Sequence, residues 1–387
     1  MNSPRLRLLA LAALSAGLLS AVASAQPSQR ATPIAWGCRH FDHGQCDVPR
    51  GLSGVLAISA GESHSLALRR NGTVAAWGCL TNEEGSDNWQ CDVPFGLSHV
   101  TAISAGTYHS LALRSNGTVV AWGCRSNFDQ CAVPNGLTGV VAVAAGTYHS
   151  LALRSDGTVV AWGCHPLDVS AGQCKVPVGL GGVTAVAAGE YQSLALKSDG
   201  TVVAWGCERR PAAPCDVPPG LTGVTAIAAG QDHSLALRRD GTVVAWGCAL
   251  YDYGQCTVPD GLTHVTAIAA GAWHSLALRR NGTVVAWGCD LDRNPGACNV
   301  PSRLVGVTAI AAGGTQSLVL ASPRCVVPRV IGMQLPAAER KLARSRCRGG
   351  TIRRISARHA SETVLFQARL AGSILRDGAR IGLIVGR

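Results

Sequence analysis

Apolar and polar positions alternate through three short runs that recur along the chain. A typical copy has a β-branched run at 224–229, a run with Leu235 and Leu237, and Thr-Val-Val-Ala-Trp at 242–246. Alternation with period two is typical of strands, here named A, B and C. Each B–C junction is Asn-Gly or Asp-Gly, which favours a tight hairpin; the junctions lie at 71–72, 116–117, 156–157, 199–200, 240–241 and 281–282.

Strand C ends in Trp-Gly-Cys in every copy, with the tryptophan at 36, 77, 122, 162, 205, 246 and 287. The steps of 41, 45, 40, 43, 41 and 41 residues indicate a repeat architecture. The first copy holds only a C strand, at 33–38, and the last holds only A and B strands, at 307–320. We therefore predict an all-β fold, a seven-bladed β-propeller over 33–322 that the N-terminal strand closes, because closure protects strand edges.

Sixteen cysteines favour an oxidising compartment. Fourteen lie in local pairs 7 to 12 residues apart, a spacing that favours disulfides over a zinc site. Each disulfide closes a short loop and is expected to stabilise the fold by about 2–3 kcal/mol. The predicted pairs are Cys38 with Cys46, Cys79 with Cys91, Cys124 with Cys131, Cys164 with Cys174, Cys207 with Cys215, Cys248 with Cys256 and Cys289 with Cys298, and Cys325 and Cys347 remain in the tail.

The two ends of the chain differ from the repeats. Residues 1–25 are typical of a secretory signal peptide, with Arg5 and Arg7 before an apolar stretch and Ala23-Ser24-Ala25 at the cleavage site. The tail, 323–387, holds 14 basic and 3 acidic residues, whereas 26–322 holds 18 and 20. A basic tail favours an anionic partner, and the alternative is a solvated arginine-rich surface.

The repeat Ala-Gly-x-x-His-Ser-Leu-Ala-Leu, followed by Gly-x-Val and Trp-Gly, resembles RCC1-type repeats over about 33–322. Its length and the Val-Pro after each loop are most similar to the secreted bacterial type, which includes β-lactamase inhibitory protein II. This resemblance implies a binding protein. The nuclear type, which exchanges nucleotides on a small GTPase and contacts chromatin, is disfavoured by the signal peptide and the cysteines.

The remainder, 325–387, resembles a PASTA domain, a small α+β fold associated with peptidoglycan. The matching residues are Val327, Pro328, Val330, Gly332, Leu335, Ala338, Leu342, Gly350, Val364, Gln367, Gly372 and Gly378. Helical spacing of the apolar positions predicts a helix that begins near 335, and 381–385 predicts a closing strand. The family's usual prolines near 368–371 are absent, which weakens the expectation of ligand binding.

Recurrent histidines at the start of strand B are a candidate chemical feature, but glutamine takes their place at 192 and 316. A hydrogen-bonding brace of the A–B turn explains both residue types. We see no nucleophile elbow, phosphate loop or repeated carboxylate pair, so no enzyme, cofactor or metal is expected; a wall-polymer-processing enzyme is the alternative. Residues 290–296 mimic the start of a calcium loop, but Pro301 stands where its glutamate belongs.

The second residue after each Ala-Gly differs between copies, and four of the seven are Tyr or Trp. Strand alternation places these A–B turns on the same face as the disulfide loops. Tyr and Trp anchor interfaces at low entropic cost; packing against adjacent blades is the alternative. The predicted partner-binding residues are Tyr108, Tyr148, Tyr191, Asp232, Trp273, Trp89, Tyr251 and Tyr253.

We therefore expect a secreted, monomeric, non-enzymatic protein without a membrane span. Its expected partner is a protein or glycan of the cell envelope, with peptidoglycan bound through the tail and no nucleic acid bound. The narrower alternative is an inhibitor of β-lactamases or penicillin-binding proteins.

Overall fold

The computed structural model describes residues 31–38, 42–79, 89–124, 129–164, 172–208, 214–248, 252–289, 296–302, 304, 306–321, 324–345, 347–356, 362–371, 374–376 and 379–386. One compact unit holds 33–320 and a second holds 321–387. The predicted signal peptide, 1–25, lies outside the described residues.

The first unit consists of three-stranded antiparallel sheets, as the alternation predicts. The A strands are β2 (Val55–Ala60), β5 (Val100–Ala105), β8 (Val140–Ala145), β11 (Val183–Ala188), β14 (Val224–Ala229), β17 (Val265–Ala270) and β20 (Val307–Ala312). The B strands are β3 (His64–Arg69), β6 (Ser110–Arg114), β9 (Ser150–Arg154), β12 (Ser193–Lys197), β15 (Ser234–Arg238), β18 (Ser275–Arg279) and β21 (Ser317–Ala321). The C strands are β1 (Thr32–Trp36), β4 (Val74–Gly78), β7 (Val119–Trp122), β10 (Val159–Trp162), β13 (Val202–Trp205), β16 (Val243–Trp246) and β19 (Val284–Trp287).

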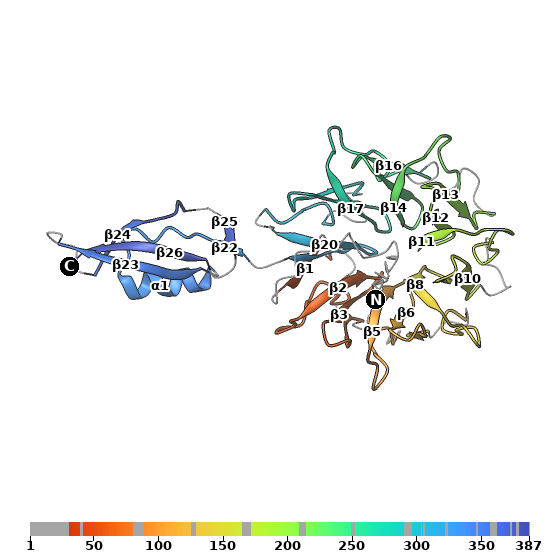
Figure 1. Cartoon of the computed structure of the whole chain (residues 1–387), viewed down its shortest axis with the longest axis horizontal. Helices are drawn as coiled ribbons and strands as arrows, with labels where there is room; N and C mark the ends of the chain where they lie inside the picture. Colours follow the sequence, from red (N-terminus) through yellow and green to blue (C-terminus); the bar gives the residue numbers. More distant parts are fainter. Residues whose placement is uncertain are drawn as a thin grey trace, which may run out of the picture. The chain divides into compact units, whose positions relative to one another are not determined.

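The sheet of β1, β21 and β20 joins the two ends of this unit, and we call it the closing sheet. Together with it, the described residues form seven such sheets. Figure 1 shows them radiating from a centre, with the A strands innermost. The prediction of an all-β repeat propeller is confirmed. The segment after each second cysteine forms turns, so no fourth strand is added there in the described residues.

The core of the unit lies between neighbouring sheets. Strand B is buried on both of its faces, as Leu66, Ala67 and Leu68 illustrate. One apolar cluster combines Leu66 and Leu68 of one sheet with Ile103 and Trp122 of the next. Because a single sheet has no partner for these faces, its stability depends on both neighbours.

Glycine after strand A allows the sheets to approach closely around the centre. The residue after this glycine donates its N–H to the glycine carbonyl of the next sheet, as in Thr147 to Gly189 at 3.1 Å and Gly314 to Gly61 at 3.1 Å. A Cβ at any of the seven glycines would lie less than 3.0 Å from the next sheet's carbonyl oxygen. The glycines are 61, 106, 146, 189, 230, 271 and 313.

We predict that Gly146→Ala destabilises the protein by on the order of 3 kcal/mol, because its methyl group collides with the carbonyl of Gly189. Gly181→Ala is the matched control, since no atom lies within 4 Å of its added Cβ. Denaturant unfolding followed by tryptophan fluorescence measures both variants. Equal midpoints for the two would contradict the close approach.

The second unit combines one helix with short strands. Its elements are β22 (Arg324–Val326), α1 (Leu335–Arg344), β23 (Arg348–Ile355), β24 (Val364–Gln367), β25 (Ile374–Arg376) and β26 (Arg380–Gly386). Strand β26 pairs with β23 in parallel and with β24 antiparallel. The predicted helix is present, with Pro336 in its first turn and Leu335, Ala338 and Leu342 buried. Within the described residues, no helix is long and apolar enough to cross a bilayer.

Candidate functional site

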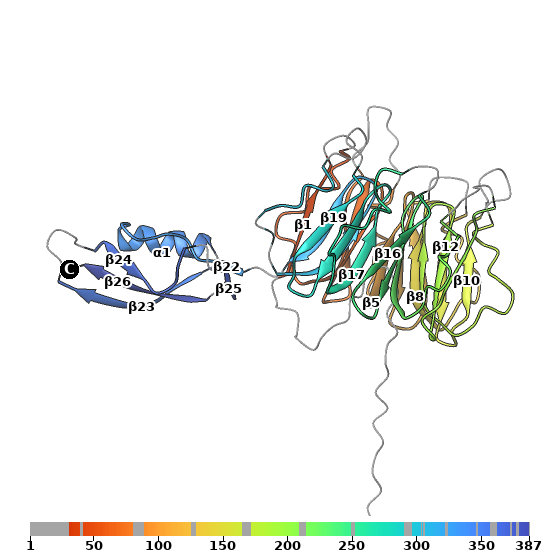
Figure 2. The ribbon, with the colours of Figure 1, turned by 90° about the horizontal axis from the view of Figure 1, so that it is seen from above.

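The A–B turns and the disulfide loops lie together at one end of the first unit, which we call the loop end. Cys79 at the start of one loop donates its N–H to Ser63 of an A–B turn at 3.1 Å. Gln90 at the end of that loop reaches Thr107 of the next sheet's turn at 3.1 Å. Figure 2 shows the strands running from this end to the opposite one. The predicted sharing of one face is therefore correct.

Seven disulfides close the loops of the loop end, and their pairing is the predicted one. Each joins the cysteine after strand C to the cysteine at the end of the same loop, with Cα atoms 5.8 to 6.1 Å apart. The bonds join Cys38 with Cys46, Cys79 with Cys91, Cys124 with Cys131, Cys164 with Cys174, Cys207 with Cys215, Cys248 with Cys256 and Cys289 with Cys298. The side chain of Cys325 lies outside the described part of the structure, so its pairing with Cys347 stays a prediction.

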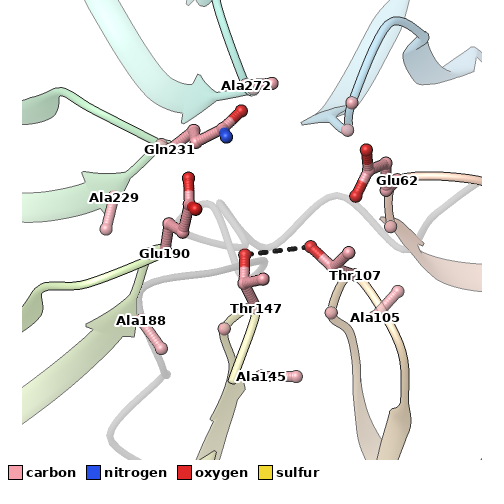
Figure 3. Close-up of a pocket in the computed structure, with 18 of the residues that line it drawn as sticks. Glu62, Ala105, Thr107, Ala145, Thr147, Ala188, Glu190, Ala229, Gln231 and Ala272 are labelled. Atoms are coloured by element: carbon pink, nitrogen blue, oxygen red, sulfur yellow. Dashed lines mark hydrogen bonds between the residues drawn. The ribbon is translucent and has the colours of Figure 1, made fainter. Parts of the chain in front are cut away.

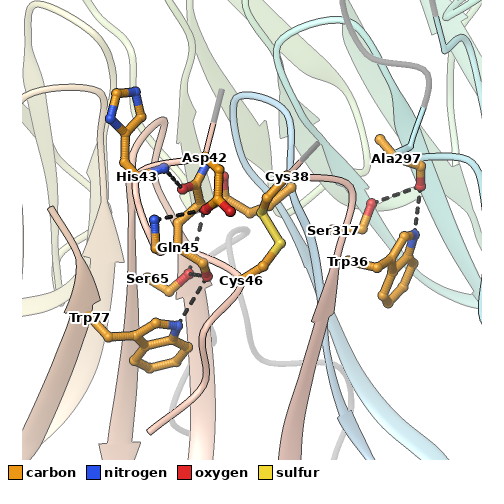
Figure 4. Close-up of a disulfide and its surroundings, with 12 residues drawn as sticks. Trp36, Cys38, Asp42, His43, Gln45, Cys46, Ser65, Trp77, Ala297 and Ser317 are labelled. Carbon is orange, nitrogen blue, oxygen red and sulfur yellow. Dashed lines mark hydrogen bonds between the residues drawn. A yellow bond between two sulfur atoms is a disulfide. The ribbon is translucent and has the colours of Figure 1, made fainter. Parts of the chain in front are cut away.

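Each loop is also fixed to the following sheet through one backbone carbonyl (Figure 4). The carbonyl of Gln45 accepts hydrogen bonds from Trp77 Nε1 at 3.0 Å and Ser65 Oγ at 3.2 Å. In the closing sheet, the carbonyl of Ala297 accepts the equivalent hydrogen bonds from Trp36 Nε1 at 2.8 Å and Ser317 Oγ at 3.1 Å. The pattern recurs at the carbonyls of Gln90, Gln130, Gln173, Pro214 and Gln255. The ends of the variable loops are thus rigidly placed.

The recurrent histidines hydrogen-bond to the next sheet rather than bracing their own turn. His109 Nε2 lies 2.9 Å from Ser150 Oγ, and both side chains are fully buried. The same bond joins His64 to Ser110, His149 to Ser193, His233 to Ser275 and His274 to Ser317. Gln192 and Gln316 replace it with bonds to backbone carbonyls of the next sheet, at 3.0 Å. The structural interpretation was right, but the partner lies in a different repeat.

Burial lowers the pKa of His64, His109, His149 and His233 to about 3, and that of His274 to about 4. Ser150 donates its hydroxyl proton to the carbonyl of Gln130 at 3.3 Å, so its oxygen accepts from His109 Nε2–H. Among the described residues, Nδ1 of the first four histidines has no partner. A second proton on these rings would therefore be buried and unpaired, which disfavours it.

We predict that the protein loses stability as the pH falls from 6.5 to 4. In the native protein four of the histidines stay neutral there and His274 begins to bind a proton only near pH 4, whereas the unfolded chain binds a proton on each, at its ordinary pKa near 6.5. Each histidine therefore removes about 1.4 kcal/mol of stability per pH unit in this window. His149→Gln copies the residue at 192 and should therefore fold. It should reduce the change of unfolding free energy with pH by the contribution of one proton. Thermal unfolding at stepped pH tests both statements; a midpoint unchanged from pH 7 to pH 5 would refute them.

Three tyrosines form a continuous arc at the loop end. The ring centroids of Tyr108 and Tyr148 are 6.1 Å apart, and those of Tyr148 and Tyr191 are 5.9 Å apart. All three are half-buried, as is Trp273, which stands one sheet farther on beyond Asp232. The predicted aromatic positions thus form an arc with a separate tryptophan.

The other predicted contact residues differ in their exposure to solvent. Asp232 is only 7% exposed and does not face solvent. Trp89 is 52% exposed. Tyr253 is half-buried and its N–H donates to Gln255 Oε1 at 2.6 Å. Tyr251 and the calcium-like residues 290–295 lie outside the described residues, and no cluster of metal-ligating side chains occurs among those described.

Beside the tyrosine arc lies the mouth of the central channel, a hollow of about 190 Å³ (Figure 3). Glu62, Glu190 and Gln231 point into it, and Thr107 and Thr147 bond to each other at 3.0 Å. Desolvation raises the pKa of Glu62, although part of its side chain is exposed. Burial, with the charges of Glu62 and Glu190, raises the pKa of Tyr108 to about 12. The described lining contains two carboxylates and no basic residue.

Carboxylates also occur elsewhere among the described residues of the loop end. The described parts of the A–B turns and disulfide loops carry seven carboxylates: Asp42, Glu62, Asp129, Glu190, Glu208, Asp232 and Asp252. Among the described residues, Lys175 follows one of these loops and pairs with Glu208 at 2.9 Å. The sequence analysis did not predict these carboxylates because it considered only the second residue after each Ala-Gly. The first residue after Ala-Gly is Glu62 in one repeat and Glu190 in another, and this position would have indicated an acidic surface.

These features define a disulfide-stabilised repeat propeller with one variable, aromatic and acidic end. The family model described as the regulator of chromosome condensation (RCC1) repeat matches six stretches, 55–85, 100–130, 140–165, 183–210, 224–255 and 265–292. The chain therefore contains RCC1 repeats. No curated protein matches the sequence.

Solved structures agree on the fold. Prp20p from Saccharomyces cerevisiae, described with its binding properties to Gsp1p and histones, is 20% identical with a TM-score of 0.58, covering 76% of this chain and 92% of that one. Human WBSCR16 is 19% identical with a TM-score of 0.54, covering 75% and 98%. The ectodomain of the receptor kinase CR4 of Physcomitrella patens is 20% identical with a TM-score of 0.50, covering 66% and 67%. At these identities the likeness establishes an RCC1-like propeller fold alone.

Proposed function

We propose that the chain is a secreted, non-enzymatic binding protein of the bacterial RCC1-like type. In this proposal the seven sheets are the blades of a closed propeller whose loop end takes a protein partner of the cell envelope. The observation that carries the proposal is the arc of Tyr108, Tyr148 and Tyr191 beside the acidic channel mouth. Protein binding is also described for Prp20p, which has the same fold. Seven disulfides support an extracellular setting.

The chemistry of the loop end favours a partner with a basic surface. The exposed Glu62 would pair with a lysine or arginine side chain that enters the channel mouth, and the buried carboxylate of Glu190 adds negative charge beside it. A tyrosine ring attracts such a cation at its face. Charge complementarity of this kind speeds association and rejects acidic competitors. A protein partner fits these observations better than a neutral glycan does.

We predict that Tyr148→Ala combined with Trp273→Ala abolishes capture of the partner from envelope extract. Both side chains are half-buried, so the double variant should lose no more than about 2 kcal/mol of stability. Phe95→Ala is the matched control, because Phe95 is fully exposed outside the loop end. Unfolding of the double variant at the assay temperature would instead assign these side chains to packing between blades. Inhibition of a purified β-lactamase or penicillin-binding protein would select the narrower alternative.

We also propose that the second unit is a PASTA-like domain that holds the protein near the cell wall. Its helix, its buried Leu335, Ala338 and Leu342, and its closing strand support this fold assignment. The excess of 14 basic over 3 acidic residues in 323–387 supports attraction to anionic wall material.

Deletion of 323–387 is predicted to reduce co-sedimentation with purified wall fragments at least about fivefold, since it removes most of the net positive charge. All seven disulfides of the first unit remain in this variant. Its retention by a cation exchanger should fall as well. Undiminished sedimentation with walls would remove the tail from the proposal while leaving the binding role of the loop end intact.

A further inference from the structure

The end opposite the loop end carries an unexpected charge, and we call it the turn end. It holds the B–C turns. In five of them the carbonyl of the turn glycine accepts from the N–H of the first residue of the next sheet's A strand, as Gly72 does from Val100 at 3.0 Å. These turns and the last residues of strand B contain nine cations and three carboxylates. The cations are Arg69, Arg70, Arg114, Arg154, Lys197, Arg238, Arg239, Arg279 and Arg280.

Six of these cations occupy one structural position. Each is the last residue of strand B and pairs with the first valine of strand A, as Arg69 does with Val55. The equivalent pairs contain Arg114, Arg154, Lys197, Arg238 and Arg279. All six are half-buried. In the described structure, Nε of Arg69, Arg114, Arg154 and Arg279 is buried without a hydrogen-bond partner. One donor of each of these four guanidinium groups is therefore not satisfied within the described structure.

The turns divide this end into two sectors. In three consecutive sheets the turn begins with a carboxylate, at Asp156, Asp199 and Asp240. Asp199 pairs with Lys197 at 3.0 Å, and the charges of Arg154 and Arg238 act on the other two. In the sheets on either side of the closing sheet, the turn begins with Asn71, Asn116 or Asn281. The five arginines Arg69, Arg70, Arg114, Arg279 and Arg280 form this basic sector, whose turns contain no carboxylate.

The choice between Asn and Asp does not follow from turn geometry. Asn71 Oδ1 accepts from the N–H and hydroxyl of Thr73 at 3.2 and 2.7 Å. Asp240 Oδ1 accepts from the same groups of Thr242 at 2.9 and 2.7 Å. Both residues therefore cap the turn equally, and the lack of a turn carboxylate beside Arg69, Arg114 and Arg279 is a separate property.

We propose that the basic sector is a second binding site, for a linear polymer that carries phosphate groups. Guanidinium groups present a planar fork of donors that matches phosphate oxygens. The five arginines lie on three sheets on the two sides of the closing sheet rather than in one pocket, so a chain of charges fits better than a single anion. The turns of the sector consist of polar residues and glycine, which offer nothing to insert into lipid.

The chain leaves the first unit at Ala321, in the closing sheet and at this same end. It continues into 323–387, with its 14 basic and 3 acidic residues. Binding at the turn end leaves the loop end accessible, so this site is independent of the proposed protein partner.

Isosteric substitutions in the full chain test the site. The triple variant Asn71→Asp, Asn116→Asp and Asn281→Asp places a carboxylate beside each strand-end arginine of the basic sector. It should bind labelled long-chain polyphosphate roughly tenfold more weakly. The slope of the logarithm of the binding constant against the logarithm of salt concentration should fall in magnitude by about three. Asp156→Asn, Asp199→Asn and Asp240→Asn together change net charge by the same amount in the other sector, and should tighten binding less than about threefold. The tail is intact in both variants, and both should unfold within about 2 °C of the parent because the turn bonds are kept.

Unchanged affinity in the first variant would overturn the site. Equal and opposite effects of the two variants would also overturn it, because binding would then follow net charge alone. Binding to anionic lipid vesicles without binding to polyphosphate would assign the sector to a membrane surface and refute the polymer. A tenfold loss confined to the first variant, with vesicles unbound, supports the proposal.

Discussion

The contact between neighbouring sheets is the constraint on which the rest of the structure depends. A three-stranded sheet of this repeat exposes apolar side chains on both faces, so it is stable only between two others. Three kinds of bond fix that contact at one end: glycine carbonyl to N–H, histidine or glutamine to the next sheet, and loop carbonyl to Trp and Ser. Gln316 makes the second of these bonds from the closing sheet back to His64. The ends of the chain therefore use the same contacts as every internal pair of sheets.

This frame explains why function is found where the repeats differ. Gly, His or Gln, Ser and Trp are occupied by contacts between sheets, so they are not available for a ligand. The two residues between Gly and His differ from repeat to repeat, and several of their side chains, including Glu62, Thr107 and Thr147, line the channel mouth. The frame places Tyr108, Tyr148 and Tyr191 on three consecutive sheets with ring centroids about 6 Å apart. An arc of that kind is pre-organised, which lowers the entropic cost of binding.

Local features were predictable from the sequence, and features between repeats were not. Strands, turns and disulfides depend on residues within about a dozen positions, so alternation, Asn-Gly and cysteine spacing were sufficient to place them. The replacement of His by Gln indicated a hydrogen bond but not its partner, because Ser150 lies 41 residues from His109. Asp232 looked like a contact residue because its position in the repeat matched that of the tyrosines, yet it is buried. Glu62 and Glu190 resembled ordinary surface acids until the turns were brought together around one channel.

The distribution of charge over the first unit shows most clearly why its surface could not be predicted from the sequence alone. Summed along 26–322, basic and acidic residues nearly cancel, which suggested a neutral body with a basic tail. Strand alternation sends the carboxylates near Ala-Gly and the loops to one end, and the arginines that finish strand B to the other. A repeat therefore converts a periodic sequence of mixed charge into two faces of opposite sign. Because opposite faces attract different partners, the same fold has room for an acidic site that selects a basic protein and a basic site that holds a polyanion.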